Sequence, residues 1–175
     1  MTADVPLVLL GLGTNQQRNE HVSLALDALT ERFGELMVSR VFESEPVGFS
    51  GGNNFYNLVV GFHSAIGVSE LSRWTKQLEW ETGRRPEDPR YGPRKLDIDL
   101  LCVGNLCGEY NGVTLPRGEI LTSAFVLRPL AERFGDVLHP ALQQDYRSLW
   151  EMASLDDQPL WPVPFQWQEK IISAP

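Results

Sequence analysis

Hydrophobic residues in the first part of the chain alternate between short strand-like runs and a helical spacing. The apolar run over residues 6–12 predicts a strand, and the three residues after it suit a turn and a helix start. Apolar side chains between Val22 and Phe33 approximate one helix face, and Gly34 is placed to end that helix. Residues 36–42 predict the next strand. The chain therefore opens with a strand, a helix and a strand.

A second unit of the same kind follows a long polar segment. Residues 44–54 are rich in Gly, Pro and Asn, which indicates a loop, and residues 55–63 predict a third strand. Ser69 can cap a helix that ends near Gly83, and residues 97–103 form an apolar strand that opens with two acids. This order is typical of an α+β, ferredoxin-like fold, in which a split βαβ antiparallel sheet has helices packed on one face.

The last third of the chain gives weaker signals. Residues 106–115 predict a hairpin, and helical patterns cover 125–134 and, less clearly, 145–152. The last 20 residues contain four prolines and two tryptophans, a composition that indicates irregular structure. We therefore expect one domain over residues 1–154 and an irregular C-terminal tail over 155–175.

Composition and charge narrow the possible functions. The 175 residues are 42% hydrophobic, which indicates one folded domain and excludes a disordered or collagen-like chain. The net charge of −8 disfavours general binding to nucleic acids and to anionic membranes. Cys102 and Cys107 lie in apolar sequence and are expected to be reduced core thiols. No signal peptide or membrane span is recognisable, so we expect a cytoplasmic protein.

Asp97 and Asp99 are the first candidates for chemistry. They are two residues apart on a predicted strand, so both carboxylates project from the same face. A pair of this kind is often only a solvated strand end. Here the strand continues as an apolar run, so the two acids need a compensating charge, and magnesium can supply it.

Basic residues gather just upstream of these acids. Five of the 15 Lys and Arg residues fall within twelve positions, namely Arg84, Arg85, Arg90, Arg94 and Lys95. They could pair with surface acids elsewhere. Beside an acid pair that can hold magnesium, however, Arg side chains suit phosphate oxygens, and the chain has no P-loop motif. The two groups together indicate a phosphoryl-transfer site.

Other candidates are less specific by themselves. Phe55 and Phe125 could be ordinary core residues, because most aromatic rings are. Asn57 is harder to place in a core, since its amide needs hydrogen-bond partners. Glu79 fits an exposed acid on a helix.

A longer motif identifies a family. The string RYGPRKLDIDLL resembles the signature of the hydroxymethyldihydropterin pyrophosphokinases of folate synthesis. The resemblance continues in LGLGTN, in the spaced residues between Phe42 and Gly48, and in FYN at residues 55–57. It covers roughly residues 6–140 and implies a pyrophosphokinase-like domain with the ferredoxin-like fold.

The resemblance implies an activity and its participants. Members of this family transfer pyrophosphate from ATP to the hydroxymethyl group of 6-hydroxymethyl-7,8-dihydropterin and release AMP. Two magnesium ions take part, and Asp97 and Asp99 match the residues that hold them. The expected partners are these small molecules alone, with no nucleic acid or membrane, and the enzyme is expected to be a monomer.

The resemblance also assigns substrate contacts. The family holds the pterin between two aromatic rings, which match Phe55 and Phe125, and contacts its edge at positions matching Ser44, Val47 and Asn57. Arg84 and Arg94 match catalytic loop arginines that also meet ATP. Further positions around ATP match Glu79, Arg90, Tyr91, Leu100, Thr114 and Arg117.

Several residues depart from the family pattern. Pro86 stands where a second loop arginine is usual, Arg117 where a histidine is usual, and Ser123 where a basic residue is usual. Glu45 replaces an apolar residue or proline beside the pterin. A diverged relative that binds pterin or nucleotide with weak or no catalysis is therefore an alternative. A second alternative is an RNA-binding module, because ferredoxin-like sheets also serve that function, but the acidic charge and the lack of an RNP motif oppose it.

Overall fold

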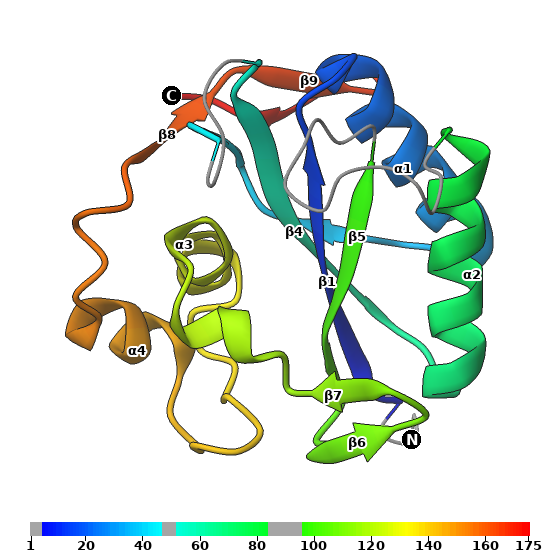
Figure 1. Ribbon diagram of the computed structural model, residues 1–175, viewed down its shortest axis with the longest axis vertical. Helices are drawn as coiled ribbons and strands as arrows, with labels where there is room; N and C mark the ends of the chain where they lie inside the picture. The colour runs from blue at the N-terminus through cyan, green and yellow to red at the C-terminus, as the bar shows by residue number, and fades with distance from the viewer. Residues whose placement is uncertain (1–4, 47–51, 84–95) are drawn as a thin grey trace.

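The first five strands and two helices form the predicted framework. The computed structural model of the chain describes residues 5–46, 52–83 and 96–175 (Figure 1). The elements of this first part are β1 (Leu7–Thr14), α1 (Arg18–Phe33), β2 (Met37–Val38), β3 (Val41–Ser44), β4 (Phe55–His63), α2 (Val68–Glu81) and β5 (Asp97–Val103). The single strand expected over 36–42 is divided at Ser39, whose hydroxyl accepts the Val59 N–H at 2.8 Å in place of a backbone carbonyl.

The remaining elements follow β5 closely. They are β6 (Gly108–Tyr110), β7 (Val113–Leu115), the short 3₁₀ helix η1 (Gly118–Leu121), α3 (Ala124–Arg133), α4 (Tyr146–Met152), β8 (Leu160–Val163), β9 (Phe165–Trp167) and β10 (Lys170–Ser173). β6 and β7 form the predicted hairpin. No helix within the described ranges is long and apolar enough to cross a membrane.

Strand pairing confirms the ferredoxin-like α+β fold. The main sheet has the order β5-β1-β4-β3-β8, with β2 also paired to β4, and its pairs are antiparallel. The two strands that precede the helices of the split βαβ units, β1 and β4, therefore lie next to each other in the sheet.

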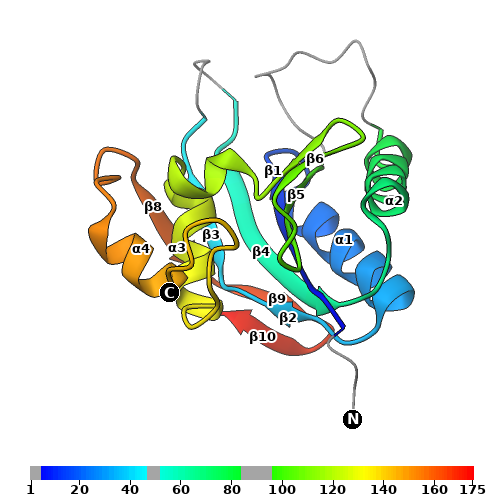
Figure 2. The same ribbon diagram turned by 90° about the horizontal axis from the view of Figure 1, so that it is seen from below.

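Helices cover both faces of this sheet, which corrects the prediction of helices on one face (Figure 2). Val8, Leu10 and Leu12 of β1 belong to the core beneath α1 and α2. Leu9 belongs to a second core with residues of α3 and α4. Because side chains alternate along a strand, β1 supplies both cores. The predicted framework was right about α1 and α2 and did not include the layer formed by α3 and α4.

The C-terminal segment is regular, which corrects the prediction of an irregular tail. β8 pairs with β3 along its whole length, from Val41 opposite Val163 to Ser44 opposite Leu160. The prolines argued against a strand here, but β8 is an edge strand, where a missing N–H is tolerated. The main sheet thus extends past residue 154 to Val163.

The two cysteines have different surroundings. Cys102 is buried and lies 3.3 Å from the Tyr146 hydroxyl, and burial raises the pKa of its thiol to about 11. Cys107 is exposed in the turn before β6, so the prediction of a core thiol was wrong there. The apolar sequence around it belongs to a strand end and a hairpin rather than to a continuous buried strand.

Gly61 of β4 controls how closely α3 approaches the sheet. A Cβ at this position would lie 2.8 Å from the Phe134 ring and 3.2 Å from a Leu9 methyl group. We expect Gly61→Ala to lower the free energy of unfolding by about 1–3 kcal/mol, because the ring must shift out of its packed position. Urea denaturation measures this change.

Gly118→Ala is the matched control for that experiment. A Cβ at Gly118 meets nothing within 4 Å, so its unfolding free energy should change by less than about 0.5 kcal/mol. Equal stability of the two variants would contradict the close packing of Phe134 on Gly61.

Candidate functional site

A cavity of about 780 Å³ opens on the face of the sheet that also carries α3. Its floor comes from the adjacent strands β1, β4 and β5, and its sides come from the end of β3, the start of α3 and residues 157–160. The residues that line it include Ser44, Phe55, Asn57, Asp97, Asp99, Arg117, Phe125 and Gln158. They come from segments far apart in the chain.

The two acids stand above glycines of the neighbouring strand. Asp97 of β5 is paired with Gly13 of β1, and Asp99 is paired with Gly11. Paired residues of adjacent strands project from the same face, so neither carboxylate has a side chain beside it on β1. Both acids are half-buried and line the cavity. The floor next to the carboxylates therefore carries no side chain from β1.

Among the described residues, Arg117 is a cation that lies beside these acids. Its backbone N–H donates to the Leu101 carbonyl at 2.9 Å, which fixes the residue next to β5. One guanidinium nitrogen lies 3.5 Å from an Asp99 oxygen and 2.5 Å from a Glu119 oxygen. Burial lowers the pKa of Arg117, but the charges of Asp99 and Glu119 outweigh it and leave the pKa above its ordinary value. Arg117 is thus a fixed positive charge at the acid end of the cavity.

Asn57 lies in the same cross-strand row as Asp97. Gly13 is paired with Asp97 on one side and with Asn57 on the other. The Asn57 amide is buried and donates from Nδ2 to the Ser44 hydroxyl at 3.1 Å. Its Oδ1 lies 3.0 Å from the position that a Cβ on residue 13 would take. Glycine at position 13 therefore leaves the space that the amide occupies.

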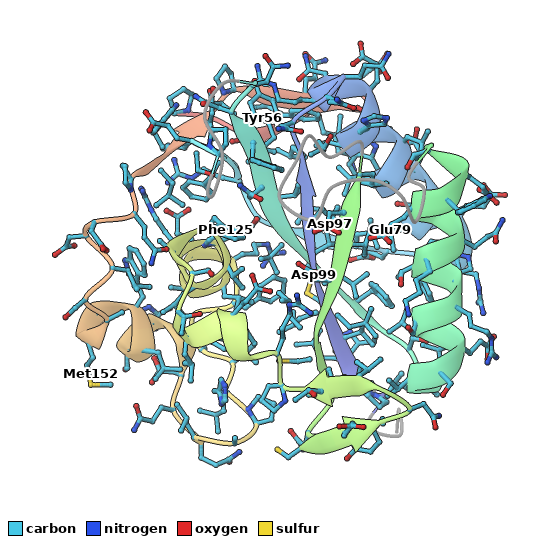
Figure 3. The ribbon with its side chains drawn as sticks, viewed as in Figure 1. Tyr56, Glu79, Asp97, Asp99, Phe125 and Met152 are labelled. Carbon is cyan, nitrogen blue, oxygen red and sulfur yellow. The ribbon has the colours of Figure 1, made fainter. Side chains whose placement is uncertain are left out.

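Two aromatic rings reach the cavity from different layers. Phe55 begins β4 in the sheet, and Phe125 lies in the first turn of α3. Phe125 is labelled with Asp97 and Asp99 in Figure 3, where the ring belongs to α3 and the carboxylates to β5. The cavity thus has an aromatic and amide part near Asn57 and a charged part near Asp99.

The structure brings together four of the five predicted pterin contacts and both predicted metal ligands. Ser44, Phe55, Asn57 and Phe125 line the same cavity as Asp97 and Asp99. The fifth, Val47, lies outside the described residues, as do Arg84, Arg90, Tyr91 and Arg94.

Three predicted ATP contacts do not line this cavity. The Glu79 carboxylate, on α2, accepts the Ile98 N–H at 2.7 Å and so holds the backbone between Asp97 and Asp99 (Figure 3). Leu100 is buried in the core beneath α1 and α2, and Thr114 is exposed on β7. Their contacts with ATP remain predictions.

The sequence did not single out several residues that shape the site. Asn15 and Asn53 exchange side-chain to backbone hydrogen bonds of 3.1 and 3.2 Å, and Arg18 donates to the Asn54 carbonyl at 3.1 Å. These bonds fasten residues 53 and 54, just before β4, to the turn after β1. Gln158 was missed because it lies in the segment expected to be irregular.

Comparison with known proteins shows which family the chain resembles. A family model described as 7,8-dihydro-6-hydroxymethylpterin-pyrophosphokinase matches residues 9–134. A 2-amino-4-hydroxy-6-hydroxymethyldihydropteridine pyrophosphokinase from Pseudomonas aeruginosa is 33% identical over 171 residues, covering 95% of this chain and 98% of the relative. The enzyme of the same name from Aquifex aeolicus is 32% identical over 134 residues, covering 76% of this chain and 83% of the relative.

Longer relatives contain the same unit as a part. A Pneumocystis carinii folic acid synthesis protein is 28% identical over 97% of this chain, which spans only 23% of that protein. The solved Plasmodium falciparum HPPK-DHPS structure aligns with a TM-score of 0.69 at 13% identity, covering 96% of this chain and 46% of that one. This likeness supports the fold.

The space above Gly13 gives a test of the site's geometry. Gly13→Ala places a methyl group against the Asn57 amide, so we expect the Asn57 side-chain NH₂ signals to move in a ¹⁵N–¹H correlation spectrum. Gly11→Ala is the control, because its Cβ would meet only the Leu101 side chain at an ordinary 3.6 Å. Unchanged Asn57 signals in a folded Gly13→Ala protein would contradict the close approach.

Proposed function

Because the chain belongs to the 7,8-dihydro-6-hydroxymethylpterin-pyrophosphokinase family, we propose that this cavity binds ATP and 6-hydroxymethyl-7,8-dihydropterin together and transfers pyrophosphate between them. The chain is thus an ATP-dependent pyrophosphokinase of folate synthesis. The observation that carries the assignment of the site is that one row of the sheet joins Asp97, the first of the two carboxylates, to the buried amide of Asn57.

The pterin occupies the aromatic part of the cavity in this proposal. Phe55 and Phe125 lie against the two faces of the flat ring system, which suits the stacking of aromatic groups. Asn57 and Ser44 meet its polar edge, where an amide can match both donors and acceptors. Val47 completes this set.

The triphosphate occupies the charged part. Asp97 and Asp99 would hold magnesium, and their donor set fits it, because Mg²⁺ is commonly bound by one or two carboxylates together with substrate phosphates. Magnesium bound there spreads the charge of the phosphates and lowers the pKa of the attacking hydroxyl group. Glu79 keeps the backbone between the two acids in place. Arg117 adds positive charge beside Asp99.

The chemical step needs positioning more than covalent catalysis. The hydroxymethyl oxygen loses its proton and bonds to the β phosphorus of ATP. The bond between that phosphorus and the oxygen bridging to the α phosphorus breaks, so AMP leaves with the bridging oxygen. Arg84 and Arg94 are assigned to stabilise charge in this step, and Arg90, Tyr91, Leu100 and Thr114 to bind ATP.

We also propose that the enzyme is a cytoplasmic monomer that uses two magnesium ions and does not bind nucleic acid. The core that α3 and α4 form on the sheet supports the last of these, because an RNA-binding sheet of this fold uses an open face.

A direct assay tests the proposed function. The protein is incubated with ATP, magnesium and 6-hydroxymethyl-7,8-dihydropterin, and the products are identified by mass. AMP and the pyrophosphorylated pterin are the expected products. Binding of both ligands without these products would instead favour the diverged, catalytically silent relative.

The two carboxylates should be necessary for turnover. Asp97→Asn or Asp99→Asn keeps the shape of the side chain but removes the charge that a metal ion requires, so we expect kcat to fall at least about a hundredfold. Circular dichroism checks the fold, and Glu151→Gln, at an exposed position on α4, is the control. If both substituted enzymes retained near wild-type kcat, the metal assignment would be wrong.

A further inference from the structure

The segment between α4 and β8 returns to the cavity and contributes Gln158 to its wall. Gln158 comes 34 residues after Ala124, yet its side chain contacts the start of α3. Its backbone N–H donates to the Leu155 carbonyl at 3.0 Å, which holds the turn that presents the side chain.

Both halves of the Gln158 amide bind the start of α3. Oε1 accepts the Ala124 N–H at 2.8 Å, and Nε2 donates to the Thr122 carbonyl at 2.9 Å. The first N–H groups of a helix have no partners within the helix. Ser123 is the N-cap of α3 but makes no side-chain capping bond, so Gln158 caps this helix from another part of the chain.

The cap lies directly beside the aromatic wall. Phe125 follows Ala124, so the residue whose N–H meets Gln158 is the neighbour of the ring that lines the cavity. A shift of the first turn of α3 would therefore move the Phe125 ring relative to the sheet.

Residues 158–160 are also held to the side of the cavity that β3 forms. Leu160, two residues after Gln158, is paired with Ser44 at the end of β3, and its carbonyl accepts a hydrogen bond from Arg128 at 3.2 Å. Residues 158–160 therefore span from the start of α3 to the strand that carries Ser44. They set the separation between Phe125 and the sheet side of the aromatic part.

We propose that Gln158 is a positioning residue for the acceptor substrate: by capping α3 it fixes Phe125 at the spacing that a flat pterin requires. The inference rests on the proposed function, because it assigns the aromatic part to the pterin. The triphosphate part lies on β5 and is linked to this cap indirectly, through the Glu119 carbonyl that Thr122 and Ser123 bind and the Glu119 carboxylate that Arg117 binds, so ATP binding should depend on Gln158 much less.

Steady-state kinetics separates this role from a general effect on stability. For Gln158→Ala we expect the KM for the pterin to rise about tenfold at saturating ATP, since small misplacement of a contact has effects of this size. The KM for ATP should change less than about twofold. Titration of the pterin in the presence of Mg²⁺ and α,β-methylene-ATP, which cannot transfer pyrophosphate, should show the same loss of affinity.

Two further variants test the capping explanation. Gln158→Glu keeps an acceptor for the Ala124 N–H and places negative charge at a helix N-terminus, but it loses the donor to the Thr122 carbonyl, so it should restore only part of the pterin affinity that the alanine variant loses. Gln158→Asn is one methylene shorter and cannot span both bonds, so it should raise the pterin KM about threefold. The Asn variant decides the question if the alanine variant does not fold. Gln166→Ala, at an exposed position on β9, is the control.

The outcomes are distinct. An unchanged pterin KM in folded Gln158→Ala, or in folded Gln158→Asn if alanine does not fold, would overturn the positioning role. So would equal losses of affinity for ATP and for the pterin. Failure of the unaltered protein to bind or convert the pterin would instead overturn the proposed function itself.

Discussion

The antiparallel register of β5, β1 and β4 is the constraint on which the site depends. It puts Asp97, Gly13 and Asn57 in one row across the sheet, on the same face. Adjacent strands lie about 4.8 Å apart, so backbone hydrogen bonds hold the α-carbons of Asp97 and Asn57 roughly 10 Å apart. The glycine at the centre of the row leaves the space above it to the Asn57 amide. The separation of the two ends of the cavity is therefore built into the sheet.

The face of the sheet that carries this row is apolar where α3 packs on it and polar at the cavity. Leu9, Gly61 and Leu101 lie where α3 packs, with Leu9 and Leu101 in the apolar core of that layer. Further along the same strands stand Asp99 and Asn57, at the open cavity. The helix that closes the core thus also supplies Phe125 to the site. Because packing and binding share this face, the placement of α3 links the stability of the fold to the geometry of the acceptor end.

The sequence predicted the parts of the molecule that local patterns determine. Short apolar runs indicated the strands of the split βαβ units, and the two-residue spacing of Asp97 and Asp99 placed both carboxylates on one face. The signature around them identified the family, and with it Phe55, Asn57 and Phe125. These residues then proved to line one cavity, a result that depends on strand order and could not follow from spacing alone.

What the sequence did not predict depends on long-range pairing. β8 contains Pro162 and follows a turn at residues 156–157, so only its pairing with β3 reveals it as a strand. Gln158 has no distinguishing local pattern, because its partners are backbone groups 34 and 36 residues earlier. Arg117 was noticed as a departure from the family, but its contacts with Asp99 and Glu119 required the structure.

The central claim is that Gly13 serves the site by leaving space for the Asn57 amide. A double-mutant cycle on the pterin KM tests it most directly, using Gly13→Ala, Asn57→Ala and the combined variant. If the two residues act through the same contact, each single change raises the KM and the double variant is no worse than Asn57→Ala alone. Independent effects that multiply in the double variant would contradict the claim.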